Sequence, residues 1–442
     1  MAGLIENLRT GAWVTRERMR LVAGLILALG LIGAIFLIAT SDGRNDRFGR
    51  PLGTDFSNVY AAGTYVLEGK ATAPFDPATQ YAREQAIFGT DTPFYGWHYP
   101  PFFLGLAALL ALLPYGLALL AWQSVTLGLY LLATRAVLLI PPPLAGEGGQ
   151  RSWPGGGVSA NGDGTPPGSA LRAEPPSPFR GGIEKQWLLP ALAFPAVFVN
   201  LGHGHNGFLT AALMATALVC LDRRPWLAGV LFGCLAYKPQ FGVLIPLVLI
   251  AGGYWRSVAA ATVTVVGLAL AVTLAFGAEV WTAFLASTQF TRTVVLEQGD
   301  TGWHKIQSVF SIVRMWGGGV TLGYAAQLVV TLSVAAALVW LWRSRSNFAL
   351  KAAALAIGTV VATPYALDYD LMLLAPAIAF LAVDGLQRGF GPYEKTVLAL
   401  LWLAPLLTRS VAQATLVPLA VPLMLLCFTL LLRRAINNTA AA

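Results

Sequence analysis

Six short polar clusters interrupt the apolar runs of this chain, and they hold most of the side chains that could do chemistry. They are Asp55–Tyr60, His98–Pro101, Gly202–Asn206, Lys238–Gln240, Trp303–Ser308 and Pro364–Asp370. Carboxylates can act as general bases, and cationic side chains can bind phosphate. Because ionisable groups at membrane depth are expensive, we expect several helices to assemble these clusters into one functional site.

The composition is that of a membrane protein. Of 442 residues, 56% are hydrophobic and only 11% are charged. A helical span needs roughly 17–25 largely apolar residues. Clear spans are expected near 20–40, 116–140, 257–276, 321–342, 349–364, 369–386 and 411–432, and shorter or broken ones near 101–113, 187–201, 206–221, 226–252 and 395–408. The sequence therefore predicts an all-α, multispanning membrane protein with about 12–13 transmembrane helices.

Arginine positions predict the orientation of the chain, because basic residues favour the cytoplasmic side. The arginines that mark inner segments are Arg9, Arg16, Arg18, Arg20, Arg223, Arg224, Arg256, Arg343, Arg345, Arg433 and Arg434. The loops 41–99 and 277–318 then lie outside, together with almost every polar cluster. Counting each short helix as a full crossing breaks the alternation, so 101–113 or 187–201 is expected to be re-entrant. This topology explains the net charge of +8 better than nucleic-acid binding does.

The chain divides into four parts. Residues 1–19 are the expected cytoplasmic N-terminus, and 20–140 hold the first spans with the periplasmic loop 41–99. Residues 141–186 are rich in Pro and Gly and are expected to be a disordered, cytoplasmic insertion. Residues 187–442 hold the remaining spans. The first apolar run is long and lacks a small-residue cleavage site, so we expect a retained first helix.

Asp55 begins an amphipathic pattern inside the loop 41–99. The pattern predicts a helix that lies on the membrane surface and makes this loop a carrier of interfacial helices. A carboxylate at a helix start can cap free backbone N–H groups. It can also act as a general base at the boundary between membrane and water. The sequence leaves both interpretations open.

Two clusters pair histidines with turn residues. His98 and Tyr99 precede two prolines at a helix start, where Tyr99 also fits an interfacial aromatic belt. His203 and His205 flank a glycine that permits a tight turn or a close approach to a ligand. No third metal ligand is nearby in sequence, so hydrogen bonding to a sugar or phosphate is the favoured interpretation of these two histidines.

The remaining clusters carry charges. Lys238 sits at a helix break, where it either snorkels to the interface or offers a fixed positive charge to a lipid-linked phosphate. His304 and Lys305 precede an apolar periodic stretch, and a helix start favours anions. Asp368 and Asp370 lie at a turn between spans, where they cap a helix or bind a sugar or a cation.

Together these motifs resemble glycosyltransferase family 87, within the GT-C superfamily of multispanning glycosyltransferases. The resemblance covers roughly 50–430 apart from 141–186. It rests on Asp55–Tyr60 with Leu67-Glu68-Gly69, on Tyr99-Pro100-Pro101, on Gly204-His205-Asn206, on Tyr237-Lys238-Pro239-Gln240 and on Thr363-Pro364-Tyr365 with Asp368. This chain departs from the family at His205, where many members have Gln, and at Tyr369 and Asp370, where some actinobacterial members have histidines.

The resemblance implies a GT-C fold and inverting transfer of a hexose, with mannose as the first choice, at the outer face of a bacterial inner membrane. The implied donor is a polyprenyl-phosphate sugar, the acceptor a lipid or glycan, and the catalytic base Asp55. The side chains expected to bind substrate are Tyr60, His98, Tyr99, His203, His205, Asn206, Lys238, Gln240, His304, Lys305, Gln307, Tyr365, Asp368 and Asp370. No cofactor and no nucleic-acid partner is expected; a divalent cation at Asp368 and Asp370 is the alternative.

Two other functions fit some of these observations. A transporter or flippase of lipid-linked sugars would also use broken helices with charges at membrane depth. Against it, the chain has no evident inverted repeat and has a long first outer loop. A non-catalytic membrane scaffold would tolerate alanine in the polar clusters, which their convergence on one face argues against.

Overall fold

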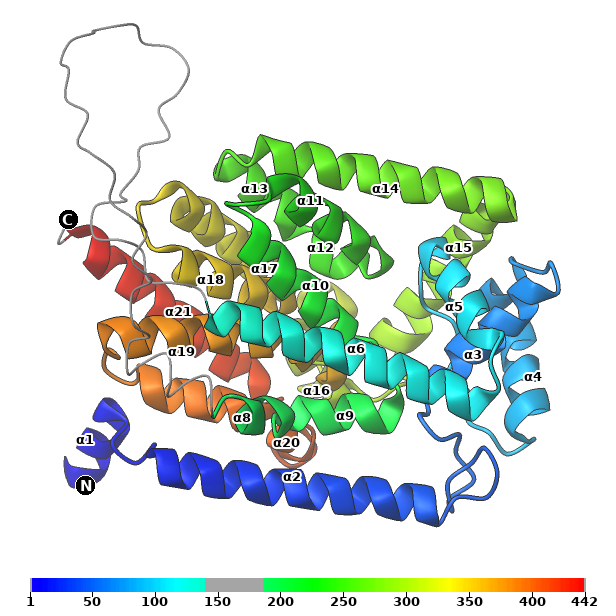
Figure 1. Ribbon diagram of the computed structural model, residues 1–442, viewed down its shortest axis with the longest axis horizontal. Helices are drawn as coiled ribbons and strands as arrows, with labels where there is room; N and C mark the ends of the chain where they lie inside the picture. Colours follow the sequence, from blue (N-terminus) through cyan, green and yellow to red (C-terminus); the bar gives the residue numbers. More distant parts are fainter. Residues whose placement is uncertain (1, 140–185, 441–442) are drawn as a thin grey trace, which may run out of the picture.

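The computed structural model describes residues 2–139 and 186–440 (Figure 1). Apart from Gln186, the expected insertion 141–186 lies outside the described residues. Within the described ranges the regular elements are helices, and β-pairing is limited to isolated bridges. The expectation of an all-α chain is confirmed for this part of the protein.

The helices follow one another through short connections. Before the undescribed segment they are α1 (Ala2–Thr10), α2 (Arg16–Ala39), α3 (Phe56–Leu67), α4 (Pro77–Phe88), α5 (Leu104–Ala111) and α6 (Tyr115–Leu138). After it come α8 (Leu188–Leu192), α9 (Pro195–His203), α10 (Gly207–Cys220), α11 (Pro225–Cys234), α12 (Pro239–Gly242), α13 (Leu244–Ala251), α14 (Trp255–Phe276), α15 (Glu279–Phe290) and α16 (Val309–Met315). The last ones are α17 (Val320–Arg343), α18 (Phe348–Val361), α19 (Leu374–Arg388), α20 (Glu394–Thr415) and α21 (Ala420–Ala440).

Seven helical segments among the described residues are long and apolar enough to cross a membrane. They are Arg16–Ala39, Tyr115–Leu138, Trp255–Phe276, Val320–Arg343, Asp368–Arg388, Glu394–Thr415 and Ala420–Asn438. Five shorter apolar helices accompany them. This confirms a multispanning membrane protein, and the number of crossings made by the shorter helices stays a prediction.

Two expected spans have different bounds in the structure. The span expected at 349–364 is α18, whose 14 residues reach only about 21 Å, less than the roughly 30 Å hydrocarbon core. The span expected at 411–432 divides between α20 and α21, because Leu416 adopts a positive φ of 61° and ends α20. Apolar residues on both sides of this turn hid it from the hydropathy pattern.

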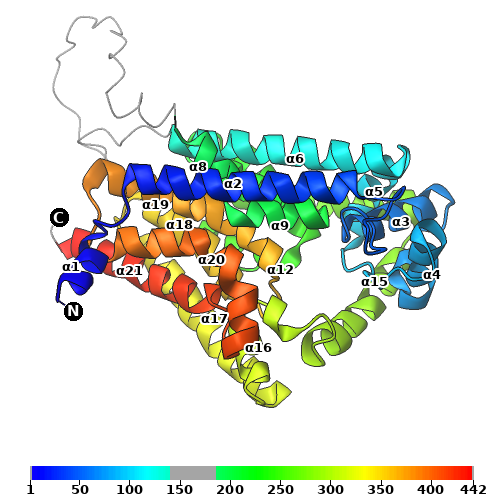
Figure 2. The same cartoon turned by 90° about the horizontal axis from the view of Figure 1, so that it is seen from below.

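Burial separates the helices of the bundle centre from those at its periphery. The window of Asp368–Arg388 is 72% buried, whereas that of α2 is 6% and that of α14 is 11% buried. In Figure 1, α2 and α14 run along opposite edges of the bundle, and Figure 2 shows the same bundle turned by 90°. The apolar side chains of α2 and α14 are therefore the ones available to lipid.

The helices of the loop 41–99 gather with α5 at one end of the bundle, opposite the end that holds α1 and the C-terminus (Figures 1 and 2). α4 has a proper N-terminal cap: Asp76 accepts a hydrogen bond from the Thr79 N–H at 2.8 Å, and Pro77 follows it. α3 packs closely against α5. The loop is thus a folded element of the protein.

Helix breaks bring polar residues to that end of the bundle. α9 ends at Gly204, whose φ of 63° is the left-handed conformation that glycine adopts without strain. The run 226–252 is broken at Lys238-Pro239-Gln240 into α11 and the pair α12–α13, as the sequence predicts. Each break frees backbone and side-chain groups that an uninterrupted apolar helix would not offer.

The contact between α3 and α5 depends on Gly63. A Cβ atom there would lie 2.1 Å from the carbonyl oxygen of Ala107, so Gly63→Ala must push the two helices apart. Overpacking of this kind costs about 1–3 kcal/mol, and we expect a lower apparent melting temperature of the detergent-purified protein. Gly105→Ala, in α5, is the matched control, because no heavy atom lies within 4 Å of its added Cβ. Equal melting temperatures for the two variants would contradict this packing.

Candidate active site

Asp55 precedes α3 but does not cap it. Its side chain makes no capping hydrogen bond, in contrast to that of Asp76 before α4. Instead its Oδ2 lies 3.0 Å from Nδ1 of His203, and the Thr54 hydroxyl lies 2.7 Å from the same nitrogen. Of the two interpretations that the sequence leaves open, the geometry disfavours the helix cap.

A small cavity of about 50 Å³ opens beside Asp55. Its lining comes from five of the six polar clusters and from the residues next to them. The lining residues are Asp55, Asn58, Tyr95, His98, Tyr99, His205, Tyr237, Lys238, Gln240, Tyr365, Tyr369 and Asp370. The expected convergence of distant clusters is therefore present, with one carboxylate and an ion pair on the same wall-lined space.

Lys238 and Asp370 form a buried ion pair. The Lys238 Nζ lies 2.5 Å from Oδ1 of Asp370, and both residues are less than 5% exposed. The other carboxylate oxygen accepts a hydrogen bond from the Leu367 N–H at 3.0 Å. Lys238 also lies 5.1 Å from the ring centre of Tyr369. The pair joins the helix break after α11 to the turn before α19, and the positive charge of Lys238 is already balanced.

His205 is held between aromatic side chains. Its ring stacks on Tyr369 with centroids 3.3 Å apart, and its Nε2 lies 3.3 Å from the Tyr99 hydroxyl. Asn200 supports the same corner, because its amide nitrogen donates to the Tyr369 carbonyl and its oxygen accepts from the Gly207 N–H. The histidine that replaces the usual Gln thus has a fixed position in the cavity wall.

A second group of charges lies next to this cavity and includes an arginine that the sequence analysis missed. Arg409 of α20 forms an ion pair with Asp368, and the short helix η5 (Trp303–Lys305) packs against α20. Partial burial lowers the pKa of both His304 and Lys305, and the positive charge of Arg409 lowers each pKa further. A lone arginine inside the apolar stretch of α20 was the signal that could have found it.

Gln307 connects this charge group to the rest of the site. Its backbone N–H donates to the Ala366 carbonyl at 2.6 Å, and its side-chain oxygen accepts from the Thr408 hydroxyl at 2.6 Å. An isolated β-bridge between Ile306 and Leu367 lies beside these bonds. Gln307 therefore positions the outer loop against the late turn and α20.

The segment that carries His98 is held by a buried acid that the sequence analysis did not single out. Glu84 of α4 accepts hydrogen bonds at 3.0 Å from the N–H groups of Tyr95 and Gly96, and burial raises its pKa to about 7. His98 Nδ1 lies 2.9 Å from the Thr291 hydroxyl, and burial lowers the pKa of His98 to about 4. His98 is therefore a neutral imidazole at neutral pH.

Some predicted site residues lie outside the cavity lining. Tyr60 donates its hydroxyl to the Leu113 carbonyl at 3.0 Å and packs edge-on against Tyr115. Asn206 is 2% exposed, and its amide group has no hydrogen-bond partner among the described residues. The others outside the lining are His203, His304, Lys305, Gln307 and Asp368. Among the described residues, no group of three or more His, Cys, Asp or Glu side chains could hold a metal ion.

The sequence model of glycosyltransferase family 87 matches residues 97–364, more than half of the 442 residues. The chain belongs to glycosyltransferase family 87. The resemblance seen in the motifs is thereby confirmed, and this family 87 protein is a membrane glycosyltransferase. No curated protein and no solved structure matches it. Asp55 precedes the matched range and Arg409 follows it.

The buried pair between Lys238 and Asp370 predicts an asymmetric mutational response. Lys238→Met leaves a buried carboxylate without its partner, which costs about 3–5 kcal/mol. The double change Lys238→Met with Asp370→Asn removes both charges, and the Asn oxygen can still accept from the Leu367 N–H, so we expect most of the stability to return. The measurement is the apparent melting temperature of wild type, single and double variants in the same detergent. A double variant no more stable than the single one would contradict the pairing.

Proposed function

We propose that this family 87 protein transfers a hexose, with mannose as the first donor to test, from a polyprenyl-phosphate carrier to a hydroxyl group of a lipid or glycan acceptor. The observation that carries the proposal is the position of Asp55. Its carboxylate has no capping hydrogen bond, is paired with His203 and faces a cavity lined by polar side chains from distant helices. A carboxylate in such a place is suited to remove a proton from a bound hydroxyl group.

The reaction we propose is a single displacement. Asp55 takes the proton of the acceptor hydroxyl while the acceptor oxygen forms a bond to the anomeric carbon. The bond between that carbon and the phosphate oxygen breaks, and the electron pair leaves with the polyprenyl phosphate. One bond forms and one breaks on opposite faces of the sugar, so the anomeric configuration inverts. No nucleotide is required, because the lipid phosphate is itself the activated leaving group.

The leaving phosphate needs positive charges that are not already balanced by buried partners. Lys305 makes no ion pair among the described residues, and Arg409 is paired with Asp368 but keeps its side chain 37% exposed. Cations placed where negative charge develops stabilise the transition state. We therefore assign the donor phosphate to Arg409 and Lys305, with His304 beside them. Lys238, whose charge Asp370 neutralises, then serves to hold the cavity wall.

The proposed setting is a bacterial inner membrane, with the cavity on the periplasmic side. The arginine distribution supports this orientation, because α1 and the C-terminal end of α21 carry basic residues at the end of the bundle opposite α3 and α4. Family membership favours an enzyme over a transporter of lipid-linked sugars. The donor and acceptor lipids would reach the site along the apolar helix faces that surround it.

Asp55→Asn tests the proposed base. Because Asp55 makes no capping bond, we expect the variant to keep the melting temperature of wild type while sugar transfer falls by at least about 100-fold, the contribution typical of a general base. The measurement is transfer of radiolabelled mannose from polyprenyl-phosphate mannose to a lipid extract in membranes.

Asp76→Asn is the control for this experiment. Asp76 caps α4 and is outside the cavity lining, so its replacement by Asn keeps transfer near the wild-type rate. Undiminished transfer by Asp55→Asn would remove Asp55 from the chemistry. Absence of transfer by wild type with this donor would redirect the proposal to another sugar or acceptor.

A further inference from the structure

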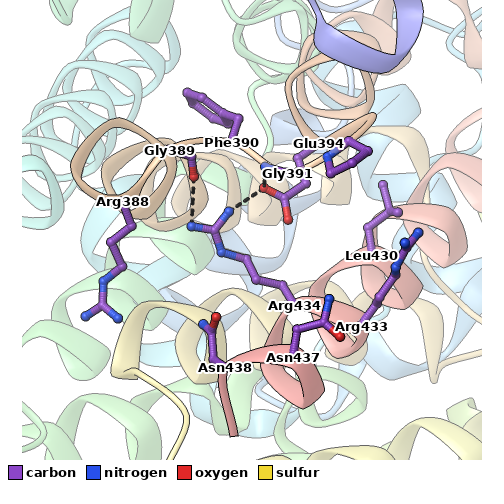
Figure 3. A pocket seen from close by; sticks show the side chains of 11 residues that line it. Arg388, Gly389, Phe390, Gly391, Glu394, Leu430, Arg433, Arg434, Asn437 and Asn438 are labelled. Carbon is purple, nitrogen blue, oxygen red and sulfur yellow. Dashed lines mark hydrogen bonds and ion pairs between the residues drawn. The ribbon is translucent and has the colours of Figure 1, made fainter. Parts of the chain in front are cut away.

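A pocket of about 350 Å³ lies at the opposite end of the protein from the candidate active site. It opens between the α19–α20 turn and the C-terminal part of α21, which Figure 3 shows from close by. It is lined by Arg388, Gly389, Phe390, Gly391, Pro392, Glu394, Leu430, Arg433, Arg434, Asn437 and Asn438. Its volume lies at the lower end of the range of small-molecule sites, about 300–1,000 Å³.

Arg434 forms a fixed centre of this pocket. Its guanidinium is paired with the buried Asp384 at 2.8 Å and with Glu394, and it donates to the Gly389 carbonyl at 3.0 Å. Figure 3 shows the contacts to Gly389 and Glu394 as dashed lines. Two acids and a carbonyl therefore balance and hold Arg434. The pocket is a built structure, and its remaining cations are available to a ligand.

Two further arginines line the pocket with less engagement. Arg388 reaches Asp384 only through its Nε, at 3.4 Å, and Arg433 has no hydrogen bond or ion pair from its side chain among the described residues. In Figure 3 they lie on either side of Arg434. The amides of Asn437 and Asn438 add hydrogen-bond donors. Three arginines against two acids leave an excess of positive charge, which suits an anion with several acceptor oxygens.

The polarity of α21 indicates that this anion belongs to an amphiphile. Leu426, Leu430, Arg433 and Asn437 follow one another at steps of four, three and four residues, so they share one face of the helix. Leu426 is 47% exposed, on a helix that is apolar enough to span the membrane. The face thus passes from lipid-exposed leucine to arginine and asparagine, as a phospholipid passes from acyl chain to headgroup.

The pocket also lies beside the basic N-terminal segment. The Tyr393 N–H donates to the Arg9 carbonyl at 2.7 Å, and the Trp13 indole N–H donates to the Thr396 hydroxyl at 2.9 Å. These bonds attach α1 and its connection to α2 to the start of α20. Because basic segments favour the cytoplasmic side, the headgroup level at this end is that of the inner leaflet.

We propose that this pocket binds the phosphate headgroup of an anionic glycerophospholipid from the inner leaflet. Arg388 and Arg433 contact the phosphate, Asn437 and Asn438 donate to its remaining oxygens, and an acyl chain follows Leu430 and Leu426 along α21. Basic pockets between helices on this side of a membrane are a known mode of lipid recognition. The proposal is independent of the sugar-transfer reaction. A free phosphate ion shares the headgroup chemistry but cannot use the apolar part of the face.

The test uses the full-length protein in a neutral detergent, titrated with phosphatidylglycerol, phosphatidylcholine or inorganic phosphate. Native mass spectrometry reports the bound lipid, and the apparent melting temperature reports stabilisation, since a ligand that binds only the folded state stabilises it. We expect phosphatidylglycerol to bind about tenfold more tightly than phosphatidylcholine. We expect inorganic phosphate to give no comparable stabilisation. Equal stabilisation by inorganic phosphate would overturn the lipid assignment in favour of a soluble anion.

Two matched double variants locate the lipid on the protein. Arg388→Gln with Arg433→Gln removes the free cations of the pocket and should abolish the preference for phosphatidylglycerol. Arg343→Gln with Arg345→Gln removes the same charge from exposed positions outside the pocket lining and should keep it. Equal loss in both pairs would mean that the preference is a general surface-charge effect, and retention in the pocket pair would refute the site.

A single variant covers the case in which the pocket pair does not fold. Arg433→Gln breaks no ion pair among the described residues, so its fold should be that of wild type. Its affinity for phosphatidylglycerol should fall severalfold while that for phosphatidylcholine stays constant. An unchanged preference for phosphatidylglycerol in this variant would also reject the proposal.

Discussion

The ion pair between Lys238 and Asp370 is the interaction on which the arrangement of the site depends. It joins two helix breaks that are far apart in sequence, at a depth where both side chains are almost completely buried. Removing one partner from such a pair costs about 3–5 kcal/mol, whereas exposed pairs contribute only about 0–1 kcal/mol. The pair therefore fixes where Tyr369 and His205 stack, and with them one wall of the cavity beside Asp55.

Much of this site could be predicted from the order of polar clusters along an apolar chain. Five of the six clusters contribute to the cavity lining, because each interrupts a helix and a bundle brings helix ends together. Arg409 and Glu84 escaped notice for a physical reason: their partners lie far away in sequence, and only the folded chain shows that Arg409 pairs with Asp368. Hydropathy likewise merged the end of α20 with α21, since the turn at Leu416 has apolar residues on both sides.

The two ends of the bundle have different chemistry. One end carries Asp55, the buried ion pair and the Arg409 group, which together suit a sugar and a lipid phosphate. The other end carries a basic pocket whose polarity follows that of a phospholipid. The helices between them are apolar, and those at the periphery, such as α2, expose their side chains to lipid. A single constraint explains this division, because charged groups in a membrane protein are confined to its ends and its interior.

The configuration of the transferred sugar tests the central claim most directly. The purified protein would be given a polyprenyl-phosphate sugar labelled with ¹³C at the anomeric carbon, and the coupling constant of that carbon would be read by NMR in the donor and in the product. A single displacement assisted by Asp55 predicts that the product has the configuration opposite to that of the donor. A product with the donor's configuration would require a covalent sugar–enzyme intermediate and would contradict the account.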